Sequence, residues 1–202
     1  NILVAYNRHM HSSEEKMILR QEIKKRIDDM DTEHRRAEGR TLSRVLLERI
    51  PKGSTICAYF PLKSEVDIQL LLKELLDRGD TVFLPGFAGK DKKMIYRRAQ
   101  NLHDLPPGEF TIPEPPESAQ ELGSEEVDII LVPGRAFDRN GRRLGRGSGG
   151  YDTWLEWYKK HHPDTPLWGT CLQCQLVMNV PVELHDVPMS TVITAQEVIE
   201  LA

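Results

Sequence analysis

Residues 127–158 read VDIILVPGRAFDRNGRRLGRGSGGYDTWLEWY, and this stretch organises the fold of the whole chain. It opens with an apolar, β-branched run, Val127–Val132, which has the length and composition of a buried strand. A glycine-rich, basic loop follows. Residues 151–158 then predict a helix, with Trp154 and Tyr158 four positions apart. A strand, a glycine-rich loop and a helix together favour phosphate binding, because glycines let backbone N–H groups approach an anion and the helix N-terminus adds partial positive charge.

The loop holds five glycines within the ten residues from Gly141 to Gly150, interleaved with arginines. Its spacing does not match the GxxxxGK[ST] of a Walker A loop, and no GxGxxG directly follows the strand. A surface loop that happens to be rich in Gly and Arg is the alternative interpretation. We favour a phosphate cradle, because ordering this many glycines carries a large entropic cost.

Length and composition restrict the class of protein. With 202 residues the chain fits one domain with a real core, and a net charge of −4 does not favour nucleic acid as a partner. No apolar run approaches the roughly 20 residues needed to span a bilayer. Three cysteines cannot all pair with one another, which favours a reducing, cytoplasmic setting. We expect residues 1–12 to form a tail and residues 13–202 a single domain.

Apolar spacing and turn residues predict the remaining elements. A first helix begins at Ser12 or Ser13, where the spacing allows a capping box. A segment rich in proline, residues 106–115, is expected to be an ordered loop. The CxxC motif at Cys171 and Cys174 is expected at the start of a helix. The other predicted elements are helices at 32–50 and 68–78, strands at 54–60, 81–85, 94–98, 167–171 and 191–194, a turn-rich connection at 87–93, and a helix start after residue 194.

The central stretch resembles the signature of the 5-formyltetrahydrofolate cyclo-ligase family, also called 5,10-methenyltetrahydrofolate synthetases. The residues that carry the resemblance are PGRAFD at 133–138, GRRLGRG at 141–147 and GGYD at 149–152. The resemblance extends over roughly residues 16–199. It implies an α/β fold, a single-domain, Rossmann-like three-layer sandwich in which helices flank a central, largely parallel sheet. It also implies ATP- and Mg²⁺-dependent conversion of 5-formyltetrahydrofolate to 5,10-methenyltetrahydrofolate, with release of ADP and phosphate.

The resemblance also implies which residues bind ATP. Lys16 and Arg20 match a Lys-x-x-x-Arg pair that reaches the phosphates, and their spacing places both cations on one side of a helix. Without the resemblance, the simplest interpretation is that Lys16 and Arg20 belong to an ordinary solvent-exposed basic face of the helix. Lys16, Arg146 and Tyr151 would have catalytic roles. The full set of expected nucleotide contacts is Lys16, Arg20, Arg143, Leu144, Gly145, Arg146, Gly147, Ser148, Gly149, Gly150 and Tyr151.

The folate is expected to bind next to the same loop. Glu65 matches the family glutamate that binds the pterin, whose adjacent N–H donors suit a carboxylate. Without the resemblance, Glu65 would be interpreted as a helix-capping residue. Met94 could equally be an ordinary core or surface residue. The full set of expected substrate contacts is Phe60, Glu65, Met94, Phe110, Ser148, Gly149, Gly150 and Tyr151.

Two carboxylates, Asp152 and Asp186, match the family residues that hold Mg²⁺. Magnesium commonly takes one or two carboxylates together with phosphate and water, so this pair beside a phosphate cradle would suit it. Each could otherwise be a helix cap or an ion-pair partner. We expect a monomer that binds a small-molecule folate, possibly polyglutamylated, and neither nucleic acid nor a membrane.

One position departs from the family pattern in a way that bears on function. The family usually carries two aromatic residues before the aspartate, and here Gly150 replaces the first of them. A lost ring contact is worth on the order of 1 kcal/mol, so weaker substrate binding is the expected effect. Gly150 is also the main argument for an alternative, a non-catalytic or weakly active paralogue that binds nucleotide or folate. A redox protein built on the CxxC is a third, less favoured hypothesis.

Overall fold

The computed structural model describes residues 2–89, 93–108, 111–147, 149–183 and 186–201. Its helices are α1 (Ile2–Asp28), α2 (Thr32–Arg49), α3 (Gln69–Asp77) and α4 (Gly150–His161), with a short 3-10 turn, η2 (Gln173–Gln175). Its strands are β1 (Thr55–Cys57), β2 (Thr81–Ala88), β3 (Lys93–Ala99), β4 (Ile129–Pro133), β5 (Ala136–Asp138), β6 (Arg143–Leu144), β7 (Leu167–Thr170), β8 (Leu176–Val177), β9 (Thr191–Ile193) and β10 (Val198–Glu200).

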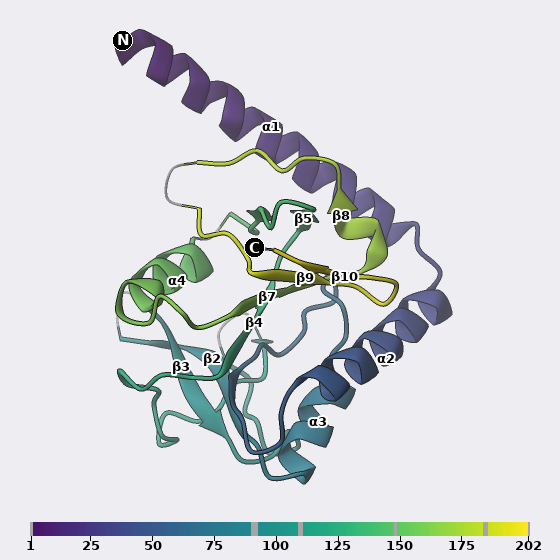
Figure 1. Cartoon of the computed structure of the whole chain (residues 1–202), viewed down its shortest axis with the longest axis vertical. Coiled ribbons are helices and arrows are strands. Elements are labelled where there is room, and N and C mark those ends of the chain that lie inside the picture. The colour runs from purple at the N-terminus through teal and green to yellow at the C-terminus, as the bar shows by residue number, and fades with distance from the viewer. Residues whose placement is uncertain (1, 90–92, 109–110, 148, 184–185, 202) are drawn as a thin grey trace.

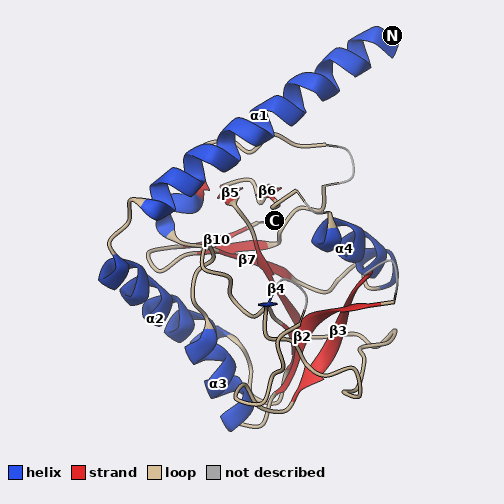
Figure 2. Ribbon diagram, turned by 180° about the vertical axis from the view of Figure 1, so that it is seen from behind, coloured by secondary structure: helices blue, strands red, loops and turns tan. Residues whose placement is uncertain are grey.

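A seven-stranded sheet forms the middle layer, in the order β10-β9-β7-β4-β1-β2-β3. The five inner strands are parallel, and the edge strands β3 and β10 pair antiparallel to their neighbours. Helices α2 and α3 lie on one side of the sheet and α4 on the other (Figures 1 and 2). The predicted fold class, a three-layer α/β sandwich with a largely parallel sheet, is therefore confirmed.

The two faces of the sheet bury two separate apolar cores, which explains why the central strand β4 is apolar at every position. In β4, Ile129 and Leu131 pack into the core under α1, α2 and α3. Ile130 and Val132 point the other way, into the core that contains Trp154 of α4. Alternate side chains of a strand face opposite sides of the sheet, so this strand needs apolar residues at both sets of positions.

The strand order reverses between β1 and β4. From β1 the chain moves to β2 on one side, whereas β4 lies against the other side of β1. In open α/β sheets the loops that follow two such strands diverge and leave a crevice at the carboxyl ends. The loop after β1 carries Glu65, and the glycine-rich segment follows β4. Both predicted ligand-binding segments thus start at this switch point. A second, small sheet, in the order β6-β5-β8, folds the glycine-rich segment back on itself.

The structure corrects several predicted boundaries. Helix α1 begins at Ile2, so the prediction that a helix starts at Ser12 or Ser13 was wrong. Residues 2–11 contain neither Gly nor Pro, and nothing in them interrupts the helix. The N-terminal end of α1 points away from the sheet (Figure 1). None of the described helices is long and apolar enough to cross a membrane.

Two further corrections concern strands. Strand β2 continues through Phe87 and Ala88, which had been assigned to a turn-rich connection. Its partner β3 pairs with every residue from Val82 to Ala88, and this long-range pairing overrides the turn-like composition. After β9 the chain forms β10 rather than a helix, again because it pairs antiparallel with its neighbour.

Candidate active site

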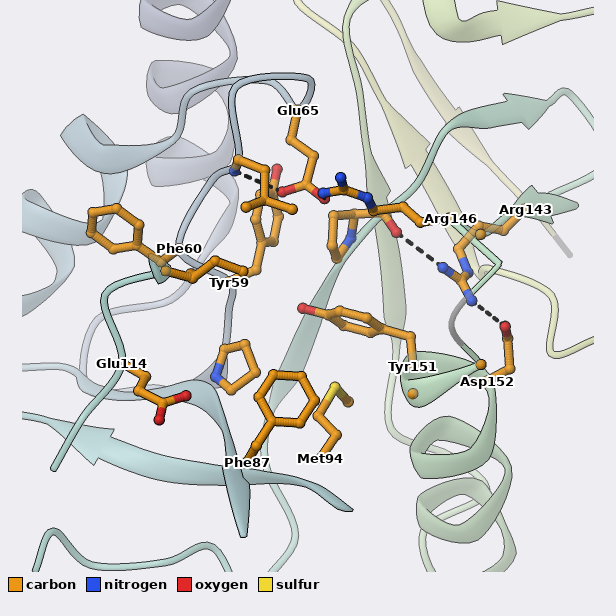
Figure 3. Close-up of a pocket in the computed structure, with 17 residues that line it drawn as sticks. Tyr59, Phe60, Glu65, Phe87, Met94, Glu114, Arg143, Arg146, Tyr151 and Asp152 are labelled. Atoms are coloured by element: carbon orange, nitrogen blue, oxygen red, sulfur yellow. Dashed lines mark hydrogen bonds and ion pairs between the residues drawn. The ribbon is translucent and has the colours of Figure 1, made fainter. Parts of the chain in front are cut away.

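A cavity of about 460 Å³ opens at the switch point (Figure 3). One wall comes from the loop after β1 and from β2 and β3, and the opposite wall from the glycine-rich segment and the first turn of α4. Ten residues predicted to bind ligand or metal line this cavity. They are Phe60, Glu65, Met94, Arg143, Gly145, Arg146, Gly149, Gly150, Tyr151 and Asp152.

Glu65 is a buried carboxylate at one end of the cavity (Figure 3). Its Oε2 accepts a hydrogen bond from the Leu62 N–H at 2.9 Å, and its Oε1 lies 3.7 Å from Arg146 Nη1. Burial raises the pKa of this carboxyl above its usual value, although the Leu62 N–H and Arg146 oppose the rise. A partly compensated carboxylate of this kind has remaining capacity for a ligand with N–H donors.

Tyr151 extends from the start of α4 across the cavity (Figure 3). Burial, together with the negative charge of Glu65, raises the pKa of its phenol. The hydroxyl therefore stays protonated at neutral pH and can donate a hydrogen bond, but it cannot act as a base. The Arg143 guanidinium lies 5.8 Å from the centre of the Tyr151 ring, within cation–π range.

The glycines of the loop are required by backbone geometry and by close neighbours. Gly147 and Gly149 have φ values of +100° and +75°, in the region that favours glycine. A Cβ on Gly145 would lie 3.3 Å from Asp152 Oδ2. Arg20 of α1 donates from Nε to the Gly145 carbonyl at 2.9 Å and so ties the helix to the loop. Arg20, which is expected to bind the phosphates, thus lies beside the glycine loop.

Two ion pairs join the cations expected to bind phosphate to the carboxylates expected to bind metal. Arg143 Nη2 pairs with Asp152 (Figure 3), and Lys16 Nζ pairs with Asp186 Oδ2 at 3.0 Å. Lys16 is buried and also lies 3.2 Å from Glu183. Lys16 and Asp186 lie where the loop after β8 meets α1, outside the cavity wall. In the described part of the chain there is no cluster of three or more His, Cys, Asp or Glu side chains suited to a metal ion.

Some predicted contacts lie elsewhere. The Leu144 side chain is buried in the core, and its carbonyl accepts a hydrogen bond from the Arg135 N–H at 2.7 Å. It cannot contact a ligand through its side chain. Gly147 is exposed beside Arg20 rather than in the cavity wall. Phe110 and Ser148 lie outside the described residues.

Tyr59, Phe87 and Glu114 are among the cavity-lining residues that the sequence did not predict (Figure 3). Phe87 was missed because its strand was predicted to end at residue 85. Glu114 lies in the proline-rich loop, which a β-bridge between Pro107 and Pro113 folds back on itself. Tyr59 lies two residues after β1, and its hydroxyl is 2.9 Å from Thr170 Oγ1. Its position at the end of a buried strand was the one signal that could have marked it.

The CxxC motif does not begin a helix, so that prediction was wrong. Cys171 follows β7, and Cys174 lies within η2, a 3-10 turn of three residues. Burial raises the pKa of both thiols, which keeps them protonated at neutral pH. A redox centre needs the opposite shift, because the thiolate is the nucleophile. The burial of these thiols therefore does not favour the redox hypothesis.

Comparison with protein families gives a match over residues 12–195 to the model of the 5-formyltetrahydrofolate cyclo-ligase family. This chain belongs to that family. A 5-formyltetrahydrofolate cyclo-ligase from Saccharomyces cerevisiae is 32% identical over 200 residues, covering 88% of this chain and 94% of the relative. One from Mycolicibacterium smegmatis is 38% identical over 151 residues, covering 70% of this chain and 74% of the relative.

Solved structures agree with this family membership. The 5,10-methenyltetrahydrofolate synthetase of Aquifex aeolicus superposes with a TM-score of 0.78 at 29% identity, covering 92% of each chain. A 5,10-methenyltetrahydrofolate synthetase from Mycoplasma pneumoniae superposes with a TM-score of 0.70 at 18% identity, covering 89% of this chain and 98% of that one. At that lower identity the second comparison speaks for the fold alone.

Proposed function

We propose that this cyclo-ligase family member converts 5-formyltetrahydrofolate to 5,10-methenyltetrahydrofolate and consumes ATP in doing so. The observation that carries the proposal is the cavity itself. A buried carboxylate stands at one end, and a basic, glycine-rich loop forms the opposite wall. Such a cavity can hold an N–H-rich heterocycle against a phosphoryl group.

The chemistry explains why ATP is needed. Amide resonance makes the formyl oxygen a poor leaving group. Transfer of the γ-phosphoryl group to this oxygen breaks the bond to the bridging oxygen and leaves ADP. N10 of the folate then attacks the formyl carbon, its proton passes to solvent, and cleavage of the carbon–oxygen bond releases phosphate.

The protein's task in this reaction is positioning and charge compensation. Glu65 would accept hydrogen bonds from the pterin, with Phe60, Phe87 and Met94 packing against the ring. Lys16, Arg20, Arg143 and Arg146 would offset the phosphate charge. Tyr151, protonated at neutral pH, would donate a hydrogen bond to the substrate.

Mg²⁺ would be held by Asp152 and Asp186, whose oxygen donors suit this ion and which would provide charge compensation at the phosphates. Each carboxylate is paired here with a cation expected to bind phosphate. If metal and phosphate bind together, carboxylates and cations can exchange partners without leaving a charge unpaired. This pairing is the structural support for the metal assignment.

A decisive test is to mix the protein with 5-formyltetrahydrofolate, Mg²⁺ and ATP and to record the near-ultraviolet absorbance of the methenyl product. We expect product to accumulate only when all three are present, with one ADP formed per product. A protein that binds ATP yet forms no product would instead be the non-catalytic paralogue. Size-exclusion chromatography would test the proposed monomer. A cytoplasmic location also stays a prediction, and a relative from Arabidopsis thaliana is named mitochondrial.

Restoring a ring at position 150 should strengthen folate binding. A Cβ on Gly150 would meet only Met94, at an ordinary contact distance of 3.9 Å, so a side chain can enter the cavity. We expect Gly150→Tyr to lower the KM for 5-formyltetrahydrofolate about fivefold, because a ring contact contributes on the order of 1 kcal/mol. Gly150→Ala is the matched control, since it makes the same backbone change without a ring. Equal KM values for the two variants would contradict the prediction.

A further inference from the structure

Arg135 is a basic residue beside the glycine loop that the reaction described above does not use. It follows β4 at the switch point and is half-buried. Its backbone is fixed on both sides, because its N–H donates to the Leu144 carbonyl at 2.7 Å and its carbonyl accepts from Gln175 Nε2 at 3.0 Å. The side chain therefore leaves from a rigid position rather than from a mobile loop.

The guanidinium of Arg135 has a buried N–H donor without a hydrogen-bond acceptor among the described residues. This donor is Nη1. Buried donors are paired in the great majority of cases, so an orphaned one points to a missing acceptor. Burial is the main cause that lowers the pKa of Arg135, and the positive charges of Arg146 and Arg20 add to it.

The neighbours of Arg135 locate the missing acceptor. Its positive neighbours are Arg146 of the loop and Arg20 of α1, and its negative neighbours are Glu65 and Asp28. Both acids are already engaged, because Glu65 lies 3.7 Å from Arg146 and Asp28 pairs with Lys24. Because Asp28 is paired with Lys24, the three guanidiniums share only the carboxylate of Glu65, which leaves a net positive site next to the loop.

The position of Arg135 relative to the cavity favours phosphate rather than folate as its ligand. Arg135 is not part of the cavity wall that contains Glu65, Phe87 and Met94. Its neighbours Arg20 and Asp28 belong to α1, whereas Arg146 and Glu65 line the cavity, so Arg135 lies between that helix and the cavity. Arg20 is bonded to the Gly145 carbonyl at the same place. The planar fork of an arginine suits two oxygens of one phosphate.

We infer that Arg135 is a further phosphate-binding residue, which joins Arg20 and Arg146 in a three-arginine site for the β- and γ-phosphates of the nucleotide. This inference rests on the proposed function, because it takes ATP as the ligand. Arg135 would contact the phosphates from the side of β4, whereas Arg20 would reach them from α1 and Arg146 from the loop. The orphaned Nη1 would donate to a phosphate oxygen.

The test compares Arg135→Met with Arg139→Met, by calorimetric titration with MgATP and with inorganic tripolyphosphate in the absence of folate. Arg139 is a suitable control because it lies in the same segment, is exposed, and pairs with Glu197 away from the cavity. We expect Arg135→Met to weaken both ligands about 10- to 100-fold, as for loss of one charged hydrogen bond. Adenosine binding should not change. Arg139→Met should leave every affinity within twofold.

Other results would overturn the inference in distinguishable ways. Unchanged ATP and tripolyphosphate affinities with a lower melting temperature would mean that Arg135 is only structural and that its Nη1 meets water. A KM change for 5-formyltetrahydrofolate that grows with the number of glutamates would assign Arg135 to the folate carboxylates. If Arg135→Met does not melt cooperatively, Arg135→Lys serves instead, with a smaller loss expected because it keeps the charge without the fork. Arg135-dependent tripolyphosphate binding by a protein without folate turnover would refute the proposed function but not this site.

Discussion

Asp152→Asn should lower kcat for methenyltetrahydrofolate formation by at least about 100-fold. Asp152 lies in the first turn of α4, lines the cavity and pairs with Arg143. Its negative charge is the property that a Mg²⁺ ligand requires, and asparagine keeps the shape but loses the charge. Metal-based charge stabilisation is worth several kcal/mol in a phosphoryl transfer, and each 1.36 kcal/mol is a factor of ten in rate.

The loss should come from function rather than from unfolding. Asparagine keeps an oxygen that can accept from Arg143, so the variant should still fold and unfold cooperatively, although the lost charge near the helix N-terminus and in the pair with the buried Arg143 should lower the melting temperature. Asp77→Asn is the matched control, because Asp77 is an exposed aspartate on α3 that pairs with Lys73. Steady-state rates at saturating ATP, with the Mg²⁺ concentration varied, provide the measurement. A kcat within threefold of the unmodified protein at every Mg²⁺ concentration would refute the metal assignment of Asp152.

Glu65→Gln should raise the KM for 5-formyltetrahydrofolate by about 100-fold or more without weakening ATP binding, because the nearby Arg146 loses a competing carboxylate. Glutamine can still accept the Leu62 N–H, which preserves the loop. It loses the charge that strengthens two hydrogen bonds to the pterin, and each charged bond is worth about 1.5–3 kcal/mol. Glu74→Gln, at an exposed position of α3, is the control. A KM that changes less than threefold would exclude Glu65 as the pterin partner.

Although Glu65→Gln should weaken folate binding, it should stabilise the folded protein. This direction follows from the raised pKa of Glu65. A carboxyl with a raised pKa in the folded state binds its proton more tightly than in the unfolded chain. Folding is therefore favoured while the group is protonated, and this contribution is lost as the pH rises through the folded-state pKa. At pH 7.5 Glu65→Gln should melt at a higher temperature than the unmodified protein, because glutamine does not carry the buried charge.

A pH series of melting temperatures and KM values checks both signs. The stability advantage of Glu65→Gln should shrink as the pH falls toward 4.5, the ordinary value for this carboxyl, where Glu65 itself is protonated. Over the same range the KM for folate of the unmodified protein should rise, because the ionised form binds the pterin. A variant that melts below the unmodified protein at pH 7.5 would contradict the raised pKa.

Local sequence signals predicted the elements that hold the site. The run at residues 127–132 became β4, and the helix predicted at 151–158 became α4. These signals are reliable because burial on both faces demands a continuous apolar run, and helical packing demands apolar residues four apart. Positive φ values explain three of the five loop glycines, Gly141, Gly147 and Gly149. Ten of the predicted site residues line one cavity because both ligand-binding loops follow strands at the switch point.

Contacts between residues distant in the chain determine the features that local sequence patterns did not predict. Phe87 and β10 belong to strands because a partner strand pairs with them, which no local pattern reports. The ion pair between Lys16 and Asp186 joins residues 170 positions apart. Local composition and spacing were enough to predict the strand, the glycine loop, the helix and the types of charged residue that surround them. Only the tertiary structure decided which charges pair, which thiols are buried and that Arg135 keeps a buried donor without an acceptor, because these properties depend on neighbours distant in the chain.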